Sequence, residues 1–419
     1  MGKITAVLLG AGMRGTYAYA SYALKHPDEI QFVAVAEPDK VKREYFCKTH
    51  SIPEDMCFER WEQLLEKPRL ADALLICTQD KMHYEPAIKA LEKGYHLLVE
   101  KPMSPDPLEC IKMGELAKEK ERVFLVCHVL RYTDFFSTIK NMLDEGRIGK
   151  LISIQHNENV AYWHQAHSFV RGNWRNSDET SPMILAKCCH DMDIMAWLAG
   201  GKCIKVSSFG SLTHFKKENA PKGAPERCLD GCPVSDECIY YAPRQYLTEN
   251  TGWPTAAICT DMSIEGRTRA LKEGPYGRCV YYCDNNVVDH QVVNLAFDNE
   301  VTAAFTMCAF TKDCTRTIKL MGTKGEIRGH MEKKEIEIID FASGENEKII
   351  LQNAREGHGG GDIKIMKEFV RLVQSDGREK GLTSADLSVQ SHIMAFAAEK
   401  SRLTGSVVEI DEYMNELTR

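Results

Sequence analysis

The stretch KITAVLLGAGMRG, residues 3–15, joins an apolar run to three closely spaced glycines. The run is typical of a buried β-strand, and a helix-like segment follows it. In that setting Gly10 would form a tight turn, Gly12 would let a pyrophosphate approach the backbone, and Gly15 would let helix and strand pack closely. The helix start would add amide donors for the phosphates. The stretch therefore predicts a dinucleotide-binding loop, which also contains Met13 and Arg14.

The same alternation of strand and helix continues through residues 1–130. A series of this kind predicts right-handed crossovers and a parallel sheet with helices on both faces. The helical patterns are EPAIKALEKG and PLECIKMGELAKEKE. The strand-like runs are KITAVLLG, IQFVAVAE, ADALLICT, YHLLVEKP and RVFLVCHV.

Residues 131–419 show a different pattern, with longer strands in succession. Short turns such as FDNE and MGTKGE join them, which favours a mostly antiparallel sheet in an α+β domain. Residues 214–286 are rich in Pro, Gly and Cys, so we expect an irregular insertion there. The helical patterns of this domain lie at about 134–146, 191–199, 362–375 and 384–403.

Composition indicates a globular protein of two domains. Its 419 residues exceed what one hydrophobic core usually organises. A net charge of -7 without a long basic run argues against nucleic acid or an anionic membrane as a partner. The chain enters a strand at once and has no apolar run of the roughly 20 residues that a membrane helix needs, so we expect a cytoplasmic protein. Cysteines that stand alone in apolar runs are expected to be reduced thiols, among them Cys77, Cys127, Cys203 and Cys308.

Glu37 ends the second strand-like run, 22 residues after Gly15. A carboxylate at this place accepts hydrogen bonds from ribose hydroxyls and repels a 2′-phosphate, which favours NAD over NADP. A surface glutamate at a strand end is the alternative. Lys40 and Arg43 lie close by in sequence and leave room for NADP.

Lys101 follows another strand-like run, in VEKP. Ligands of open α/β sheets bind outside the carboxyl ends of the strands, so this lysine is expected beside the cofactor. Its ammonium group could donate to a substrate hydroxyl or carbonyl. Pro102 would fix the turn and is a candidate for a cis peptide bond. An ordinary exposed lysine is the alternative.

Four motifs together resemble the Gfo/Idh/MocA family of NAD(P)-dependent oxidoreductases: GAGMRG, VAEPD, CTQDKMHYEPAIKALEKGYHLLVEKP and HDMDIMAWLAG. The resemblance implies a Rossmann domain followed by a domain with a large open-faced sheet. It implies a carbohydrate substrate and a homodimer or homotetramer formed through that sheet. Lys101 takes the place of the family's active-site lysine, and the cofactor region would include Thr78, His83 and Glu100.

His190 matches the family histidine that acts as general acid and base. Its ordinary pKa of about 6.5 suits that work. A helix cap is the alternative role for a histidine at a helix start. Asp193, one helical turn onward, could orient His190 or support the site. The family commonly has an aspartate four residues before this histidine, where the present chain has Ala186 with Lys187 beside it.

Residues 156–176, HNENVAYWHQAHSFVRGNWRN, mix aromatic rings with many hydrogen-bond donors. Carbohydrate sites use this mixture, because sugars present apolar CH faces and dense hydroxyls. Packing against a neighbouring subunit is the alternative. The substrate-binding candidates are Arg131, Tyr162, Trp163, His164, Arg171, Trp174, Arg175, Lys187 and Asp193.

The expected insertion contains several cysteines close together in sequence. Thiolates so placed suit tetrahedral zinc, which could staple a segment with little core of its own. The candidate ligands of a structural zinc are Cys228, Cys232 and Cys238, completed by Cys283 or Cys279. An iron-sulfur cluster and plain buried thiols are the alternatives.

These features predict an oxidoreductase that moves hydride between nicotinamide and a hydroxyl or keto carbon of a sugar, polyol or sugar derivative. Lys101 and His190 would be its catalytic residues. The alternative is an NAD-dependent glycoside hydrolase that works through a transient keto-sugar and recycles the cofactor in place. A nucleotide-binding regulator without catalysis is a third reading, which the presence of both residues disfavours.

Overall fold

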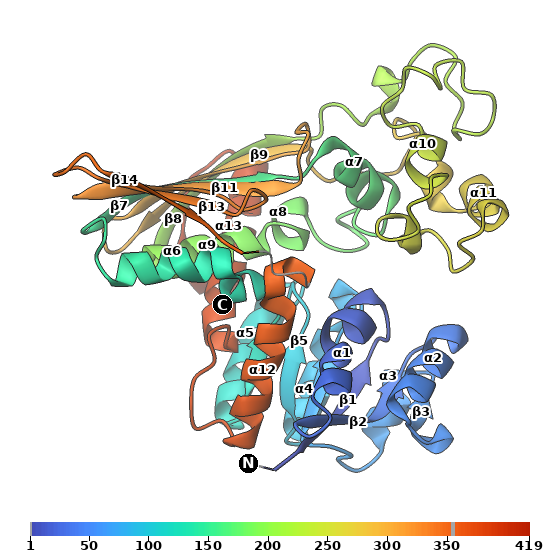
Figure 1. Cartoon of the computed structure of the whole chain (residues 1–419), viewed down its shortest axis with the longest axis horizontal. Helices are drawn as coiled ribbons and strands as arrows, with labels where there is room; N and C mark the ends of the chain where they lie inside the picture. The colour runs from blue at the N-terminus through green and yellow to red at the C-terminus, as the bar shows by residue number, and fades with distance from the viewer. Residues whose placement is uncertain (1, 353–356) are drawn as a thin grey trace.

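The computed structural model describes residues 2–352 and 357–419, and its chain forms two sheets with their covering helices (Figure 1). The first sheet has six parallel strands in the order β3-β2-β1-β4-β5-β6. This is the predicted Rossmann arrangement. Its strands are β1 (Ile4–Leu9), β2 (Ile30–Ala36), β3 (Cys57–Phe58), β4 (Ala73–Ile76), β5 (His96–Val99) and β6 (Phe124–Val126).

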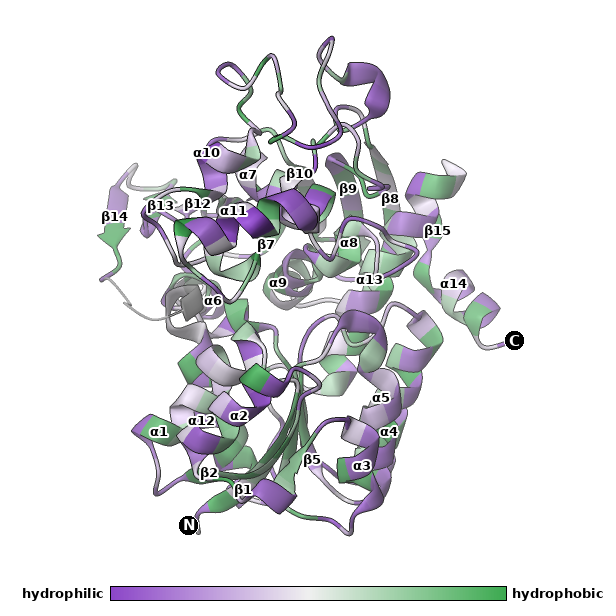
Figure 2. Cartoon of the chain, turned by 90° about the vertical axis from the view of Figure 1, so that its right-hand side faces the viewer, coloured by the Kyte–Doolittle hydropathy of each residue, from purple (hydrophilic) through white to green (hydrophobic). Residues whose placement is uncertain are grey.

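Helices cover both faces of this sheet, which explains why β4 and β5 are buried along their whole length. Figure 2 shows the apolar strands enclosed between more polar helices. The connections are η1 (Met13–Ala20), α1 (Ser21–Lys25), α2 (Lys40–His50), η2 (Glu54–Met56), α3 (Trp61–Glu66), η3 (Asp80–Met82), α4 (Tyr84–Glu92) and α5 (Pro107–Glu119). The segment after the glycine-rich loop differs from the expected α-helix, because η1 is a π-helix.

The second sheet has nine strands in the order β14-β13-β12-β11-β7-β10-β9-β8-β15. Its neighbouring strands run antiparallel except for β7 and β10, which are parallel, so the predicted mostly antiparallel sheet is confirmed. The strands are β7 (Leu151–Asn159), β8 (Cys203–Ser211), β9 (His290–Phe297), β10 (Thr302–Cys308), β11 (Thr315–Gly322), β12 (Gly325–His330), β13 (Glu335–Asp340), β14 (Asn346–Ile350) and β15 (Val408–Glu409).

Helices line one side of this second sheet (Figure 1). The longest, α13, packs against β8, α5 and α9, so it touches both parts of the molecule. No helix within the two described ranges is long and apolar enough to cross a membrane. The helices are η4 (Val129–Tyr132), α6 (Asp134–Asp144), α7 (Tyr162–His164), η5 (Gln165–Arg171), α8 (Met183–Ala186), α9 (Cys189–Ala199), η9 (Gly357–Gly360), α12 (Gly361–Gln374), α13 (Ala385–Thr404) and α14 (Ile410–Leu417).

The chain returns to the first sheet near its end. Helix α12 lies beside the Rossmann helices, although it is separated from them by more than two hundred residues (Figure 1). Its buried Ile365, Phe369 and Val370 belong to the same apolar cluster as Leu8 of β1. The apolar core of the first sheet therefore includes a helix from near the end of the chain.

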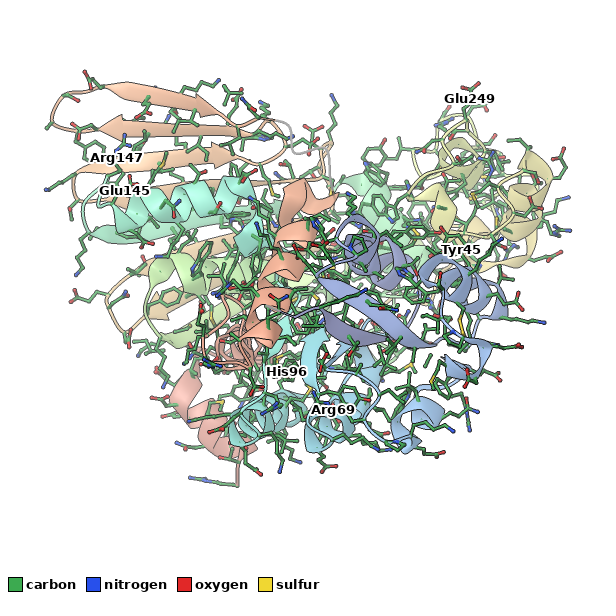
Figure 3. The ribbon with its side chains drawn as sticks, turned by 60° about the horizontal axis from the view of Figure 1, so that its bottom comes forward. Tyr45, Arg69, His96, Glu145, Arg147 and Glu249 are labelled. Carbon is green, nitrogen blue, oxygen red and sulfur yellow. A yellow bond between two sulfur atoms is a disulfide. The ribbon has the colours of Figure 1, made fainter. Side chains whose placement is uncertain are left out.

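The expected insertion leaves the second sheet between β8 and β9 and projects from one end of the molecule (Figure 1). In Figure 3, its residue Glu249 lies at the end opposite Glu145 and Arg147. Two small apolar clusters form its core. Its helices are η6 (Lys217–Asn219), α10 (Ala242–Tyr246), η7 (Thr255–Ala257), α11 (Ile264–Glu273) and η8 (Pro275–Gly277).

Cysteine chemistry differs in one place from the expectation of isolated thiols. Cys47 and Cys57 form a disulfide that joins the end of α2 to β3. The other cysteines of the described chain are free thiols, including Cys77 and Cys127 beneath the sheet edge.

Two glycines of the loop after β1 are expected to affect different properties. Gly15 would affect the stability of the protein, and Gly12 the binding of the dinucleotide. A Cβ at Gly15 would lie 2.2 Å from the carbonyl oxygen of Gly10, whereas a Cβ at Gly12 would meet nothing within 4 Å. We expect Gly15→Ala to lower the free energy of unfolding by about 1–3 kcal/mol through overpacking. Gly12→Ala should keep the stability of the parent protein and bind dinucleotide more weakly. Thermal unfolding with and without NAD measures both, and equal melting temperatures for the two variants would contradict the assignment.

Candidate functional site

The glycine-rich loop and the acid after β2 meet at the carboxyl edge of the first sheet. Glu37 is buried, and its carboxylate accepts a hydrogen bond from the amide of Ala11 at 2.7 Å. Gly10 has φ of +88°, a backbone conformation that suits glycine. The space above Gly12 is open. These features fit a dinucleotide whose pyrophosphate lies over the loop and whose ribose hydroxyls reach Glu37.

Arg14 of the loop turns inward and joins three parts of the chain. Its Nε lies 2.7 Å from Glu100 Oε1, and its Nη2 lies 2.8 Å from Asp362 Oδ1 at the start of α12. Tyr19 donates to the same Glu100 oxygen at 2.6 Å. Burial alone would raise the pKa of Glu100, but the positive charges of Arg14 and Lys101 hold it below its ordinary value. Arg14 therefore anchors the loop, and its charge is already balanced.

Lys101 is held by contacts with both domains. Its Nζ donates to the carbonyl oxygen of Ala186 at 2.9 Å, and its amide donates to Glu100 at 3.0 Å. The peptide bond to Pro102 is cis. The ring nitrogens of His83 lie 2.7 Å from the carbonyl oxygen of Pro102 and 3.1 Å from that of Thr78, so this ring connects the segments after β4 and β5. The lysine therefore reaches from the cofactor edge to the second domain.

His190 lies in the first turn of α9, four residues after the carbonyl that binds Lys101. Its ring centroid is 5.7 Å from that of buried His128, which in turn is 5.4 Å from that of His392. Burial, followed by the charges of Arg131 and Lys101, lowers the pKa of His128 well below its ordinary value. His190 is thus backed by a neutral histidine.

Lys187 belongs to a buried network of charges beside α9. Its Nζ lies 3.2 Å from Glu158 of β7, whose other carboxylate oxygen lies 2.6 Å from Arg316 of β11. Arg316 also contacts Asp191 at 2.7 Å, and His156 contacts the same carboxylate at 2.8 Å. Burial opposes the charge of Lys187, but Glu158 raises its pKa above the ordinary value. Lys187 therefore stays a cation, paired with Glu158.

Arg131 and Asp193, two predicted substrate residues, bind each other instead of lying open. The guanidinium forms two hydrogen bonds of 2.7 Å with the carboxylate and a third of 3.0 Å with the carbonyl oxygen of Leu382. Both side chains are buried, and Trp197 covers the guanidinium at 5.4 Å. This pair joins the end of the Rossmann domain to α9.

Arg171 lies within the packing of the insertion. It is completely buried and donates to the carbonyl oxygens of Arg278 and Tyr240, each at 2.7 Å. The geometry gives it a stabilising position, because it ties η5 to two segments of the insertion.

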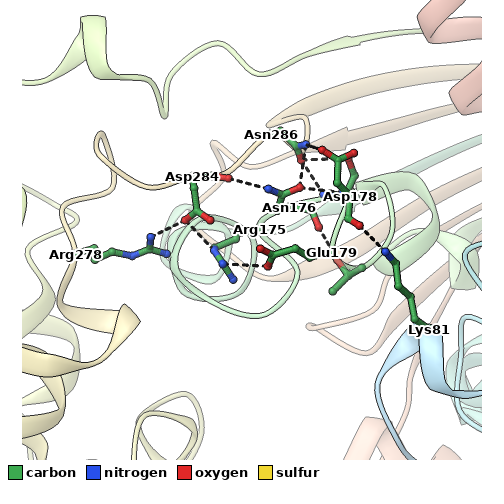
Figure 4. A network of polar contacts seen from close by, with 10 residues as sticks. Lys81, Arg175, Asn176, Asp178, Glu179, Arg278, Asp284 and Asn286 are labelled. Atoms are coloured by element: carbon green, nitrogen blue, oxygen red, sulfur yellow. Dashed lines mark hydrogen bonds and ion pairs between the residues drawn. The ribbon is translucent and has the colours of Figure 1, made fainter.

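Arg175 belongs to a separate polar network (Figure 4). Its guanidinium lies 2.9 Å from Asp284 and 3.0 Å from Glu179, and Arg278 binds the same aspartate. In the same network Lys81, at the Rossmann edge, donates to the carbonyl oxygen of Asp178. The network therefore links the insertion, the loop after η5 and the first domain.

The predicted aromatic residues contact different parts of the molecule. Tyr162 packs against Tyr240 of the insertion, with ring centroids 6.1 Å apart. Trp174 donates through Nε1 to Asp80 at 3.2 Å, at the edge that carries Thr78. Trp163 and His164 lie side by side, with ring centroids 5.6 Å apart.

The cysteines proposed for zinc face one small cavity, but the predicted ligand set is not formed. Cys228, Cys232 and Cys238 line a cavity of about 10 Å³ together with Cys279. The fourth predicted ligand, Cys283, donates instead to the carbonyl oxygen of Cys279 at 3.3 Å. Within the described chain no three His, Cys, Asp or Glu side chains are arranged to hold a metal ion.

Arg171 provides the physical reason for this correction. Its guanidinium lines the same cavity and contacts Cys228 Sγ at 3.6 Å, so a cation of the chain lies where a metal would. Burial raises the pKa of Cys279 to about 11, so its thiol is neutral. The structure gives the zinc prediction no support.

Sequence reasoning did not select several residues that complete the site. Local sequence holds no signal for them, because each partner comes from a distant strand or helix. They are His128, His392, Glu158, Arg316, Asp80 and the carbonyl group of Ala186.

Two family models match the chain over most of its length. One, described as "Oxidoreductase family, NAD-binding Rossmann fold", matches residues 4–128. The other, described as "Oxidoreductase family, C-terminal alpha/beta domain", matches residues 140–379. The chain belongs to the Gfo/Idh/MocA family. The predicted family, the predicted fold class and an NAD(P)-dependent dehydrogenase are thereby confirmed.

Three proteins similar to this chain are distant from it in sequence. YteT of Bacillus subtilis (strain 168) is 23% identical over 317 residues, which are 71% of this chain and 72% of that protein. A 2,7-anhydro-N-acetylneuraminate hydratase of Mediterraneibacter gnavus is 24% identical over 48% of this chain and 51% of that protein. A solved levoglucosan dehydrogenase, in complex with NADH and L-sorbose, has a TM-score of 0.73 and 18% identity, covering 98% of this chain and 99% of that chain. At this identity the structural likeness establishes the fold.

The pair of Arg131 and Asp193 makes a stability prediction. Arg131→Met leaves a buried carboxylate without its cation and should lower the free energy of unfolding by about 3–5 kcal/mol, measured by urea denaturation. The double variant Arg131→Met with Asp193→Leu should recover most of that loss, because no buried charge remains. Arg147→Met is the matched control, since its pair with Glu347 is exposed and should be worth less than about 1 kcal/mol. Equal losses for the two arginine variants would show that the buried pair has no special role.

Proposed function

We propose that this oxidoreductase transfers hydride between NAD and a carbon that bears a hydroxyl or keto group in a sugar, a polyol or a related compound. The observation that carries the proposal is the hydrogen bond from Lys101 to the carbonyl of Ala186, which sets the lysine between the cofactor edge and the helix of His190. The cofactor would supply the hydride acceptor or donor. The chain would supply the binding, the orientation and the proton transfer.

Lys101 and His190 take separate roles in this proposal. An ammonium group has three N–H donors, of which Ala186 occupies one, so others remain for the substrate oxygen. Lys101 thereby holds that oxygen and favours the negative charge that grows on it as its proton leaves. His190 accepts the proton in oxidation and returns it in reduction. Lys187 and His164 are proposed to bind other hydroxyl or acidic groups of the substrate.

We propose NAD as the preferred cofactor, with NADP as the weaker alternative. The buried carboxylate of Glu37 would repel a 2′-phosphate. Arg43, which could have bound that phosphate, donates instead to the backbone carbonyl oxygens of Glu37 and Pro38.

A second candidate function is redox-neutral cleavage or hydration of a glycosidic bond through a transient keto-sugar. The ketone would acidify the neighbouring C–H, the substituent would leave, water would add, and the hydride would return. The absence of a carboxylate at Ala186 favours a proton path unlike that of a simple dehydrogenase. The relative named as a 2,7-anhydro-N-acetylneuraminate hydratase supports this second candidate function.

We propose that a second copy of the chain covers the open face of the second sheet. Phe209 of β8 and Val292 of β9 are exposed by 63% and 40%. Phe209 and Val292 are paired across neighbouring strands, so their side chains share one face. A homodimer or homotetramer would bury these apolar groups.

The proposed reaction is tested by following NADH absorbance together with product analysis. The purified protein is offered free sugars, polyols, sugar acids and glycosides, with NAD or with NADP. NADH formed in step with an oxidised product is expected. Release of a sugar from a glycoside without net NADH would support the redox-neutral alternative.

Lys101→Ala should lower kcat by at least about 100-fold while NAD binding changes little, because the lysine acts on the substrate oxygen. Isothermal titration with NAD and the turnover assay separate the two effects. A variant that turns over as fast as the parent would exclude this lysine from catalysis. A parent protein that binds NAD but oxidises no compound of the panel would favour the reading as a regulator.

The proposed assembly is tested with Phe209→Asp, which places a charge on the face expected to be covered. We expect its solution mass, measured by light scattering after gel filtration, to fall from an oligomer to a monomer. Phe341→Asp is the control, because Phe341 is 57% exposed in the turn after β13. An unchanged mass for Phe209→Asp would place the subunit contact elsewhere.

A further inference from the structure

The insertion reaches back to the substrate side of the site through its contacts with η5. Gln245 donates to the carbonyl oxygen of Trp163 at 3.3 Å. His167 lies 2.8 Å from the hydroxyl of Tyr246 and stacks on Tyr276 with ring centroids 4.9 Å apart. The insertion is therefore fixed to the same segment that carries Trp163 and His164.

Trp253 of the insertion lies against three rings of that segment. Its ring centroid is 5.0 Å from that of His164, 5.4 Å from that of Trp163 and 5.7 Å from that of His167. All three contacts are edge-to-face or close to it, a favourable geometry for aromatic pairs. We call these four residues the aromatic cluster. The other three rings hold the indole of Trp253 in one orientation.

Trp253 remains 47% exposed despite these contacts. A large apolar ring that is held on one side and open on the other presents a flat surface to solvent. Such a surface loses no further side-chain freedom when a ligand lies on it. Sugars carry apolar CH faces that stack on rings of this kind.

The aromatic cluster is continuous with the reacting region. His164 contacts Phe169 with ring centroids 5.8 Å apart, and Phe169 contacts Trp174, which binds Asp80 at the cofactor edge. Burial and then the charge of Lys187 lower the pKa of His164, so these two side chains also lie close. Lys187 follows directly after Ala186, whose carbonyl holds Lys101.

We propose that Trp253 is the stacking platform for a second carbohydrate unit, one position beyond the ring that reacts. This rests on the proposed function, because it assumes a carbohydrate at Lys101 and His190. The insertion would then determine the substrate preference, and a disaccharide or a glycoside would be preferred over a free monosaccharide. His164 and Lys187 lie between the two units and are placed to bind hydroxyl groups near the linkage.

The experiment compares Trp253→Ala with the parent protein on cellobiose, maltose, lactose and melibiose and on their monosaccharides, glucose and galactose. The readouts are NADH formation and sugar release. We expect the ratio of disaccharide to monosaccharide kcat/KM to fall at least fivefold, with the change mainly in KM. Trp253→Tyr, which keeps a ring, should retain most of the ratio. Ile264→Ala is the control, since Ile264 is 49% exposed on α11 of the same insertion.

A second readout does not depend on turnover. Isothermal titration of the Lys101→Ala protein, saturated with NAD, gives the Kd of each disaccharide, and adding Trp253→Ala should raise the tightest Kd at least fivefold. Binding without turnover in the parent protein would overturn the proposed function but leave the platform intact. The proposed platform is wrong if Trp253→Ala changes neither the ratio of disaccharide to monosaccharide kcat/KM nor the Kd. It is also wrong if the protein binds no disaccharide.

Discussion

The buried carboxylate of Glu100 is the group on which the arrangement of the site depends. It accepts hydrogen bonds from Arg14, from Tyr19 and from the amide of Lys101. Through Arg14 it also connects to Asp362 of α12. A buried carboxylate is costly unless it is paired and hydrogen-bonded, so these partners must lie where they do. The motif VEKP thus couples the glycine-rich loop, Lys101 and the returning C-terminal helix.

Features set by short-range pattern were predictable from the sequence. The apolar run before Gly10 forms the buried strand β1, because the pattern that predicts a strand is local. The large antiparallel sheet followed from successive strands with short turns. The parallel pairing of β7 and β10 did not, since it joins segments separated by about 140 residues.

The roles of the arginines could not be predicted, because they depend on distant partners. Arginines such as Arg131 and Arg171 are typical of binding surfaces. Here both are buried among acceptors from other segments. A guanidinium pairs as well with a carboxylate or a carbonyl of the chain as with a ligand. Only the tertiary structure separates these cases. The same holds for Lys101, whose partner is a backbone carbonyl that carries no side-chain signal.

The charges beside α9 bear on how the proposed site would work without a carboxylate at position 186. Among the described residues, the carboxylates on this side of the site already face cations: Glu158 faces Lys187 and Arg316, and Asp191 faces Arg316. The carbonyl of Ala186 holds Nζ in place but carries no net charge. In the proposed reaction, an aspartate there would add a negative charge next to the oxygen that would become negative during proton transfer. In that mechanism the neutral acceptor would keep the lysine in position and leave its positive field directed at the substrate oxygen.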